Sequence, residues 1–337
     1  GFAIAAGDGS RNVRRWDERG AALITVLLLV AIMSVLAVAL LDDIRFGIRR
    51  ATNAAENGQA QWYALGAEAL ARSRISRLAA GNGRTSLAGN WPDRLVQFPV
   101  EEGQIGMRLA DGGACFNLNS VVEGAGEMLR RRDRGAAQFL SLLLALEVPP
   151  EDAATLTATL VDWIDSDALR EAGGAEDEAY TDAPLARRTG ATLLAEASEL
   201  RAIHGFSEAI YRRLRPHVCA LPTTDITMIN VNTLPRARAV LLTALTNGRL
   251  LPADAARLIA MRPAGGWRDE ATFRAEPLLA ELSESGGPSD QVSLRTRFFL
   301  LETDVRHGDA EALSTTLFES TGLGEVRLVS RRWGAEG

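Results

Sequence analysis

A long uncharged apolar run lies near the start of the chain. Residues 21–41 carry no charge, and Thr25 and Ser34 are their only polar side chains. At about 1.5 Å of rise per residue, a helix of this length crosses the roughly 30 Å hydrocarbon core of a bilayer. A cleaved signal peptide is the alternative, but its apolar region has only about 7–15 residues. The length of the run and the Asp42-Asp43 pair that ends it favour a membrane anchor.

Helical spacing continues beyond the apolar run. No proline occurs from Ile44 to Ala80, and Gly81-Asn82-Gly83 then supplies a C-terminal stop. We therefore expect one continuous helix of about 60 residues, on the order of 90 Å long, with half in lipid and half in water. The aqueous half carries apolar residues at near-helical intervals, at Ala64, Leu65, Ala67, Leu70, Ala71, Ile75 and Leu78.

The pattern changes after residue 83, first to short strands and then to helices. Strands are expected at residues 95–100, 105–110 and 114–119, separated by turn-forming residues. Another short strand is expected at 228–231, and residues 292–304 are again strand-like. The pattern predicts an α+β fold in which sheet segments enclose a helical block. The expected helices span residues 136–146, 153–164, 198–203, 208–214, 237–246 and 253–260.

The basic residues are all arginine, and their distribution bears on orientation. We attribute the absence of lysine to genome composition, because no binding mechanism requires every cation to be a guanidinium. Four arginines precede the apolar run and three follow it, a small excess that favours a cytoplasmic N-terminus. They are Arg11, Arg14, Arg15 and Arg19, and then Arg45, Arg49 and Arg50.

The net charge of −6 is concentrated in one short window. The composition, 47% hydrophobic and 24% charged, is that of a folded protein without extensive disorder. Residues 162–182 hold eight acidic residues and one basic residue, so the rest of the chain is close to neutral. The acidity is therefore local. The acidic residues are Asp162, Asp165, Asp167, Glu171, Glu176, Asp177, Glu178 and Asp182, and the basic one is Arg170.

Part of this window has the composition of a calcium site. Asp165 and Asp167 can converge on one ion, while Glu176 and Asp177 return across the Gly173-Gly174 turn. Calcium takes six to eight oxygen ligands in flexible geometry, whereas zinc prefers histidine and cysteine, which are scarce here. A solvated acidic loop without a cation is the alternative. Because so many like charges repel one another, we expect calcium to raise the melting temperature.

Other chemical motifs are sparse. The chain has three histidines and contains neither a G-x-S-x-G elbow nor a phosphate-binding G-x-x-x-x-G-K-[ST] loop, so we expect no enzymatic activity. Cys115 and Cys219 lie in no metal-binding spacing. In an oxidising compartment they can close one disulfide, and in a reducing one they are two buried thiols.

Two stretches look like helix-hairpin-helix units, at residues 200–206 and at 229–233 leading to 255–259. Elsewhere this motif grips DNA phosphates through backbone amides. The alternative function is therefore a membrane-anchored DNA-binding protein of the competence type. A DNA-binding protein of this kind needs a basic surface, whereas the acidic window of this chain repels phosphate. We favour packing modules, with no nucleic acid as partner.

The N-terminal sequence resembles a type IV prepilin. A short basic leader ends at Gly20, an apolar stretch follows at once, and a long helix continues from it. The resemblance implies that prepilin peptidase cuts after Gly20 and methylates the new N-terminus, Ala21. Most pilins carry glutamate at the fifth mature position, where this chain has Thr25. A subunit at a filament tip has no neighbour above it to pair with that charge, which would be costly in hydrocarbon.

Thr25 marks a tip position in this interpretation, and the chain resembles the K-type minor pseudopilin of type II secretion. Nearly the whole chain takes part in the resemblance. The stretches that carry it are Cys115-Phe116-Asn117-Leu118-Asn119, Asp162-Trp163-Ile164-Asp165-Ser166-Asp167, Gly174-Ala175-Glu176-Asp177 and Ile229-Asn230-Val231-Asn232-Thr233.

The resemblance implies a fold and a division of the chain. The fold is a pilin-like long N-terminal helix packed on a small antiparallel sheet, with a large inserted helical domain of the SAM-like, helix-hairpin-helix kind. Its parts are a leader at 1–20, a transmembrane segment at 21–42, a periplasmic helix at 43–82, sheet segments at 83–122 and 288–337, an inserted helical domain with the acidic loop at 123–222, and a second helical hairpin segment at 223–287.

The resemblance also implies a function and a place in the cell. The subunit joins the I-type and J-type minor pseudopilins, initiates and caps a short periplasmic filament, and supports protein export across the outer membrane. It sits in the inner membrane as a single-pass protein with its N-terminus in the cytoplasm and its body in the periplasm. There it contacts the outer-membrane secretin or cargo. The family binds calcium in the acidic loop, and the periplasm allows Cys115 and Cys219 to pair.

Overall fold

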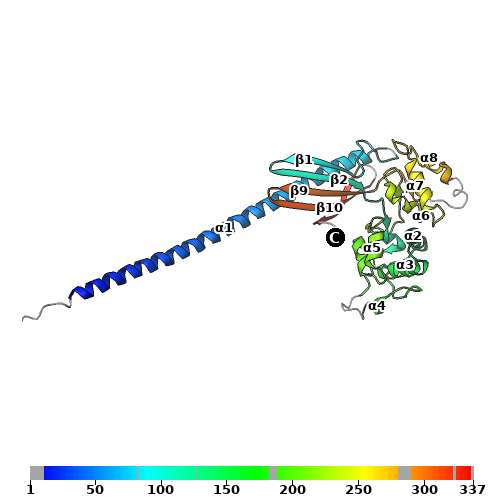
Figure 1. The fold of residues 1–337 in the computed structure, drawn as a ribbon. Helices are drawn as coiled ribbons and strands as arrows, with labels where there is room; N and C mark the ends of the chain where they lie inside the picture. Colours follow the sequence, from blue (N-terminus) through cyan, green and yellow to red (C-terminus); the bar gives the residue numbers. More distant parts are fainter. Residues whose placement is uncertain are drawn as a thin grey trace, which may run out of the picture.

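The computed structural model describes residues 11–81, 83–126, 128–181, 188–279, 290–321 and 324–334. Its first element is α1, an unbroken helix over Arg11–Ala79 that projects far beyond the rest of the molecule (Figure 1). It begins about ten residues before the expected start at the apolar run, and no proline in residues 11–20 interrupts it. By length and composition, its Gly20–Ala79 part can cross a membrane, and its most apolar stretch is not covered by any other part of the described chain.

Five strands form one antiparallel sheet in the order β1-β2-β9-β10-β11. Every neighbouring pair is antiparallel, and one bulge interrupts the pairing of β10 with β11, between Leu317 and Phe318. The strands are β1 (Arg94–Val100), β2 (Gly103–Asp111), β9 (Phe298–His307), β10 (Ala310–Ser320) and β11 (Val326–Trp333). The sheet covers only the end of α1 that is distant from the apolar run (Figure 1).

A stripe of mostly small side chains brings α1 close to the sheet. Residues spaced three or four apart share one face of a helix, and the small ones let the backbone approach strands β9 and β10. Trp91 and Phe299, whose ring centroids are 5.3 Å apart, fill the space near the helix end. Leu70 lies on the opposite face and is 58% exposed. The buried stripe is Ala60, Ala64, Ala67, Ala71, Ile75 and Leu78.

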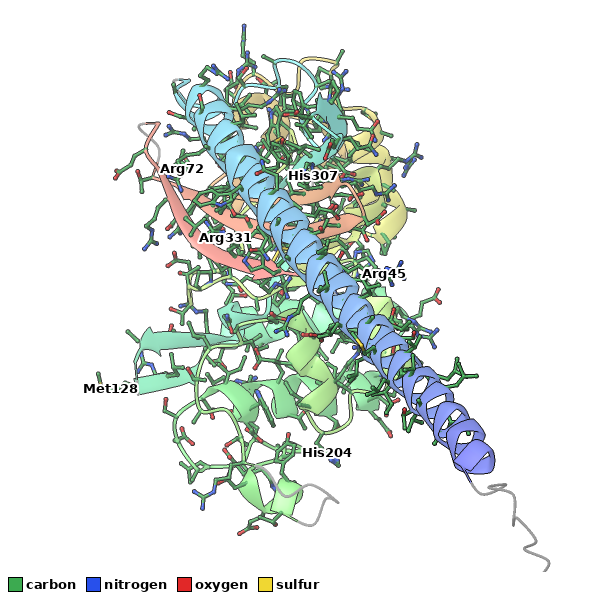
Figure 2. All side chains as sticks on the ribbon, turned by 90° about the vertical axis from the view of Figure 1, so that its left-hand side faces the viewer. Arg45, Arg72, Met128, His204, His307 and Arg331 are labelled. Atoms are coloured by element: carbon green, nitrogen blue, oxygen red, sulfur yellow. A yellow bond between two sulfur atoms is a disulfide. The ribbon has the colours of Figure 1, made fainter. Side chains whose placement is uncertain are left out.

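One ion pair with a buried carboxylate fixes α1 on the last strands. Glu68 is 4% exposed and accepts hydrogen bonds from Nη2 of Arg331 at 2.7 Å and from the hydroxyl of Thr316 at 3.0 Å. Arg331 on β11 lies beside the helix in Figure 2, and this hydrogen bond raises the pKa of its guanidinium. The pair ties the helix to strands that lie about 250 residues later in the chain.

A helical region is inserted between the neighbouring strands β2 and β9. The chain leaves and returns at one place, where the amide of Gly112 donates to the carbonyl of Phe298 at 2.9 Å. Two short parallel strand pairs, β3 (Phe116–Asn117) with β6 (Val218–Cys219) and β7 (Ile229–Asn230) with β8 (Val292–Ser293), bind its ends together. Its helices are α2 (Asp133–Ala145), α3 (Pro150–Ile164), α4 (Asp177–Thr181), α5 (Glu208–Leu214), α6 (Val240–Leu245), α7 (Pro252–Ala260) and α8 (Glu270–Arg274).

A single hydrophobic core runs through this helical region. It includes Phe139 and Leu142 of α2 together with Leu241 and Leu245 of α6. The inserted helical domain (123–222) and the second helical hairpin segment (223–287), which were predicted as separate parts, therefore pack against each other. Figure 1 shows the region beyond the sheet, at the end of the molecule away from the start of α1. The expected α+β arrangement, a long N-terminal helix on an antiparallel sheet with an added helical region, is confirmed.

Several expected elements differ from those observed. The strand expected at residues 114–119 is only β3, because the Asn117 side chain accepts from the amide of Asn119 and starts the 3₁₀ helix η1 (Leu118–Val121). The segment near 198–203 is the 3₁₀ helix η2 (Ala197–Ala202) rather than an α-helix. A hairpin of β4 (Val122–Ala125) and β5 (Met128–Arg131) was not anticipated. The second helical segment also contains η3 (Arg236–Arg238), ahead of α6.

Candidate functional site

Three sets of predicted functional residues occupy separate places in the fold. Gly20, Ala21 and Thr25 lie on the projecting part of α1, where they are exposed. Among the described residues, no atom outside the helix comes within 4 Å of the position where a Cβ on Gly20 would lie. The hydroxyl of Thr25 donates to the carbonyl of Ala22 at 2.8 Å. Thr25 therefore satisfies its own polar group within the helix and needs no neighbouring chain to do so.

The acidic loop follows directly from the end of α3. Oxygen atoms of Asp165, Asp167 and Glu176 lie within 4.8 Å of one another. The pKa of the Asp165 carboxyl is raised to about 7, first by burial and then by the charges of Asp167, Asp162 and Glu176. Burial likewise raises the pKa of Glu176. Three of the four residues predicted as ligands are thus brought together.

The fourth predicted residue, Asp177, points elsewhere. Its Oδ1 accepts hydrogen bonds from the backbone amide and the hydroxyl of Thr189, at 2.8 and 3.0 Å. These two hydrogen bonds lower the pKa of Asp177. Asp177 opens helix α4, where it helps to hold the returning chain segment near Thr189.

Asp162 belongs with the cluster, although sequence reasoning did not single it out as a ligand. It lies in the last turn of α3, is 1% exposed, and accepts from the amide of Glu171 through Oδ1. Its Oδ2 has no hydrogen-bond donor among the described residues, and neither do Oδ1 of Asp165 and Oε1 of Glu176. Because unpaired buried carboxylate oxygens are costly, these atoms fit the coordination of a divalent cation.

The surrounding chain is shaped to hold the carboxylates together. A Cβ on Gly174 would come within 1.9 Å of Oδ2 of Asp162, so only glycine allows this approach. Ser166 exchanges two hydrogen bonds with Leu129 of β5, each 2.9 Å long. Arg131 of the same strand forms an ion pair with Glu171 at 2.8 Å. The unanticipated hairpin therefore supports the loop from one side.

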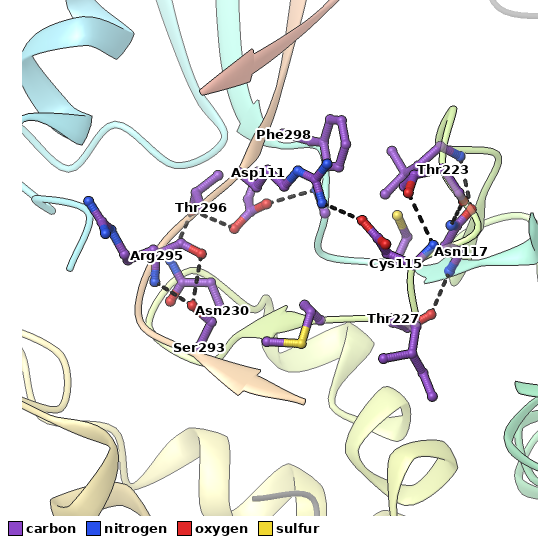
Figure 3. Close-up of a pocket in the computed structure, with 16 residues that line it drawn as sticks. Asp111, Cys115, Asn117, Thr223, Thr227, Asn230, Ser293, Arg295, Thr296 and Phe298 are labelled. Atoms are coloured by element: carbon purple, nitrogen blue, oxygen red, sulfur yellow. Dashed lines mark hydrogen bonds and ion pairs between the residues drawn. The ribbon is translucent and has the colours of Figure 1, made fainter. Parts of the chain in front are cut away.

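The two cysteines meet where the sheet joins the helical region. Cys115 and Cys219 form a disulfide with Cα atoms 5.8 Å apart, beside the parallel pairing of β3 with β6. A cavity of about 220 Å³ opens next to it, lined among others by Asp111, Asn117 and Met228 (Figure 3). The disulfide closes a loop that contains helices α2 to α5.

Buried polar side chains complete this junction. Asp111, at the end of β2, accepts hydrogen bonds from the hydroxyls of Thr233 and Thr296 and from the amide of Gly113. Burial raises the pKa of its carboxyl despite these bonds. Asn117 accepts from the amide of Leu221 at 3.0 Å. The asparagine-rich stretches noted in the sequence thus tie loops together inside the protein.

The two stretches that look like helix-hairpin-helix units contribute side chains to the core. In the first, Ile203 and Phe206 flank a left-handed Gly205 and are 3% and 7% exposed. In the second, Ile229 and Val231 are fully buried. The large apolar residues of both stretches thus pack inside the protein, whereas Arg201 and His204 of the first are exposed.

Comparison with known proteins identifies relatives along nearly the whole chain. Two family models, both described as "Type II secretion system (T2SS), protein K", match residues 114–223 and 229–295. Type II secretion system protein K of Pectobacterium carotovorum subsp. carotovorum is 34% identical over 323 residues, covering 95% of this chain and 98% of that protein. The protein K of Klebsiella pneumoniae is 36% identical over 318 residues, covering 94% and 97%.

A solved structure agrees with this result. The crystal structure of the GspK-GspI-GspJ complex from the type 2 secretion system of enterotoxigenic Escherichia coli contains a chain similar to this one, with a TM-score of 0.75 and 31% identity. The match covers 85% of this chain and 100% of that chain. The resemblance seen in the sequence is confirmed, and the chain belongs to the type II secretion system protein K family.

Proposed function

We propose that this chain is the minor pseudopilin that caps the type II secretion pseudopilus, where it assembles with the I-type and J-type minor pseudopilins. The observation that carries the proposal is the likeness, along the whole of the solved chain, to a protein crystallised in complex with GspI and GspJ. Membership of this family gives the chain a structural role in secretion rather than a catalytic one.

The shape of the molecule supports a position at the tip. The helical region lies beyond the sheet, at the end of α1 opposite the apolar run (Figure 1). A further subunit stacked above would occupy the same space. Thr25 supports the same position, because its hydroxyl is satisfied by its own helix. In this position the helical region faces the secretin or exported cargo.

Assembly is tested by co-expressing the full-length chain with its I-type and J-type partners and purifying the complex in mild detergent. The expected product contains the three chains in a 1:1:1 ratio. A matched variant that lacks residues 112–297, with the sheet closed by a short linker, separates the contribution of α1 from that of the helical region. Independent elution of the three full-length chains would contradict the proposal.

The proposed membrane topology follows from the same function. The N-terminus lies in the cytoplasm, α1 crosses the inner membrane once, and the body lies in the periplasm. Prepilin peptidase cuts between Gly20 and Ala21 and methylates Ala21. Mass spectrometry of the membrane form should find a methylated N-terminus at Ala21, and Gly20→Leu should retain the leader. An unmodified N-terminus at another residue would contradict this assignment.

The acidic loop is proposed to bind calcium. Asp165, Asp167 and Glu176 would hold the ion, and the nearby charge of Asp162 adds to the negative field around them. Bound calcium neutralises the negative charge of the carboxylates and connects the end of α3 to the returning loop. The buried carboxylate oxygens without hydrogen-bond donors support the proposal, because the carboxylates of a freely solvated loop would be exposed to water.

Calcium binding is tested by thermal melting of the full-length protein in detergent, with calcium or with chelator. Calcium should raise the melting temperature of the wild type, and Asp165→Asn should remove the difference. Glu178→Gln is the matched control, because it removes one charge from the same acidic window outside the cluster and should leave the difference intact. Equal melting curves for the wild type would exclude calcium binding.

For the finer fold, we infer that the helical region is of the SAM-like, helix-hairpin-helix kind and that its hairpins serve for packing. The burial of Ile203, Phe206, Ile229 and Val231 supports this role. The family membership favours the secretion subunit over the competence-type DNA-binding protein. We therefore expect no nucleic acid among its partners.

A further inference from the structure

The segment that follows the apolar run combines arginines with large apolar side chains. Ile44, Phe46 and Ile48 are 57%, 67% and 61% exposed. Arg45, Arg49 and Arg50 alternate with them along the same two turns of α1. The helix here stands clear of the sheet and the helical region (Figure 1), and Figure 2 labels Arg45 on α1. No other part of the described chain buries these apolar side chains.

The arrangement around the helix distinguishes a lipid partner from a protein partner. At 100° per residue, Ile44 and Ile48 share one side, Arg45 and Arg49 the next, and Phe46 lies on the far side. A helix that packs on a protein has its apolar residues in one stripe. Here apolar and basic residues alternate around the whole circumference, which suits a helix surrounded on all sides by phospholipids.

The distance along the helix places the segment at the surface of the bilayer. Residues 21–41 already span the roughly 30 Å hydrocarbon core at about 1.5 Å per residue. The polar layer on each side is about 5–8 Å thick. Residues 42–46 fall within it, and the longer side chains of Arg49 and Arg50 can reach back to the phosphates. Arginine near the end of a membrane-spanning helix is a residue type that anchors the helix at this depth.

We propose that residues 42–50 form a headgroup collar whose arginines bind the phosphates of anionic phospholipids and fix the depth of α1 in the membrane. The proposal rests on the membrane-spanning placement of α1 under the proposed function, and does not depend on assembly with partners. Asp42 and Asp43 oppose this attraction, and Asp42 forms an exposed ion pair with Arg45 at 3.8 Å. Three arginines against two aspartates leave one net positive charge in the collar.

The test uses the full-length chain in nanodiscs of mixed phosphatidylglycerol and phosphatidylcholine. The ratio of the two lipids that remain bound after mild detergent extraction is measured by mass spectrometry. One net positive charge at the surface should enrich the anionic lipid roughly fivefold over the bulk mixture. Substituting all three collar arginines by glutamine should lower the enrichment well below that of the wild type, because the four arginines before the apolar run are common to both chains, while Asp42→Asn with Asp43→Asn should increase it.

The matched control substitutes Arg72, Arg74 and Arg77 by glutamine, which removes the same charge from the aqueous half of α1. It should retain the wild-type enrichment. An equal lipid ratio for the wild type and the collar variant, or the same loss in the control, would overturn the proposal. Because co-elution of the chain with the nanodisc reports membrane insertion separately, a failure of the collar is distinguishable from a failure of the membrane placement.

Discussion

The disulfide between Cys115 and Cys219 should be a major source of stability for the helical region. The two cysteines are 104 residues apart in the sequence, and the bridge restricts the unfolded chain more strongly as the loop it closes lengthens. In the chain-entropy relation, a loop of this length corresponds to about 4.7 kcal/mol at 25 °C. This is a factor of roughly 2,000 in the unfolding equilibrium constant.

The measurement is a urea titration of the full-length protein in mild detergent, followed by tryptophan fluorescence. With an m value of about 3 kcal/mol per M, reduction should lower the midpoint by about 1.5 M. Cys115→Ala with Cys219→Ala should unfold near the reduced midpoint and should not respond to reductant. Unfolded, unreduced wild-type protein should show no titratable thiol. The reasoning is refuted if reduction leaves the wild-type midpoint unchanged, or if it shifts the double variant equally.

Three further predictions follow from single side chains. Glu68→Ala should destabilise the protein by about 2–3 kcal/mol, less than for a fully buried pair because Arg331 is 32% exposed. In a double-mutant cycle, the Glu68→Ala, Arg331→Ala double variant should lose much less stability than the sum of the two single losses. Additive losses would show that the two side chains do not stabilise the protein as a pair. Gly174→Ala should weaken calcium binding at least tenfold, since its Cβ displaces Asp162, and a calcium titration with wild-type affinity would disprove this. Because burial raises the folded-state pKa of Asp111 above its unfolded value, the folded protein binds the extra proton at low pH. This contribution to stability is lost as the pH rises through the folded pKa. The stability deficit of Asp111→Asn should therefore shrink between pH 4 and pH 7 in denaturant titrations, and a deficit that is constant with pH would show that Asp111 does not titrate this way.

The long helix and the helical region were predictable because their signals are local. An uncharged run, an unbroken helical spacing and a glycine-rich stop define α1 without tertiary information, and its buried stripe includes Ala64 and Ile75. The spacing alone could not show that Leu70 faces outward, because alanines on the other face occupy the contact with the sheet. The short hairpin of β4 and β5 was missed because its stability comes from contacts with the acidic loop, such as that of Leu129 with Ser166.

The acidic loop shows the same limit for a functional site. The sequence indicated the window and the turn at Gly173-Gly174, but the direction of each side chain depends on the backbone. Glu176 and Asp177 are adjacent in the sequence, yet neighbouring side chains at a helix start diverge, and Asp177 binds Thr189 instead. Asp162 was not singled out because a carboxylate in the last turn of a helix faces the loop only once that loop folds back over it.

The place where the helical region joins the sheet has an evolutionary consequence. Since the chain departs at Gly112 and rejoins at Phe298, across a single hydrogen bond between adjacent strands, the register of those strands is independent of what lies between. An ancestral small pilin could acquire such an insert at one loop and enlarge it stepwise while keeping its original helix and sheet. Relatives should then differ in size and surface mainly in the insert, while the long helix and the sheet change little.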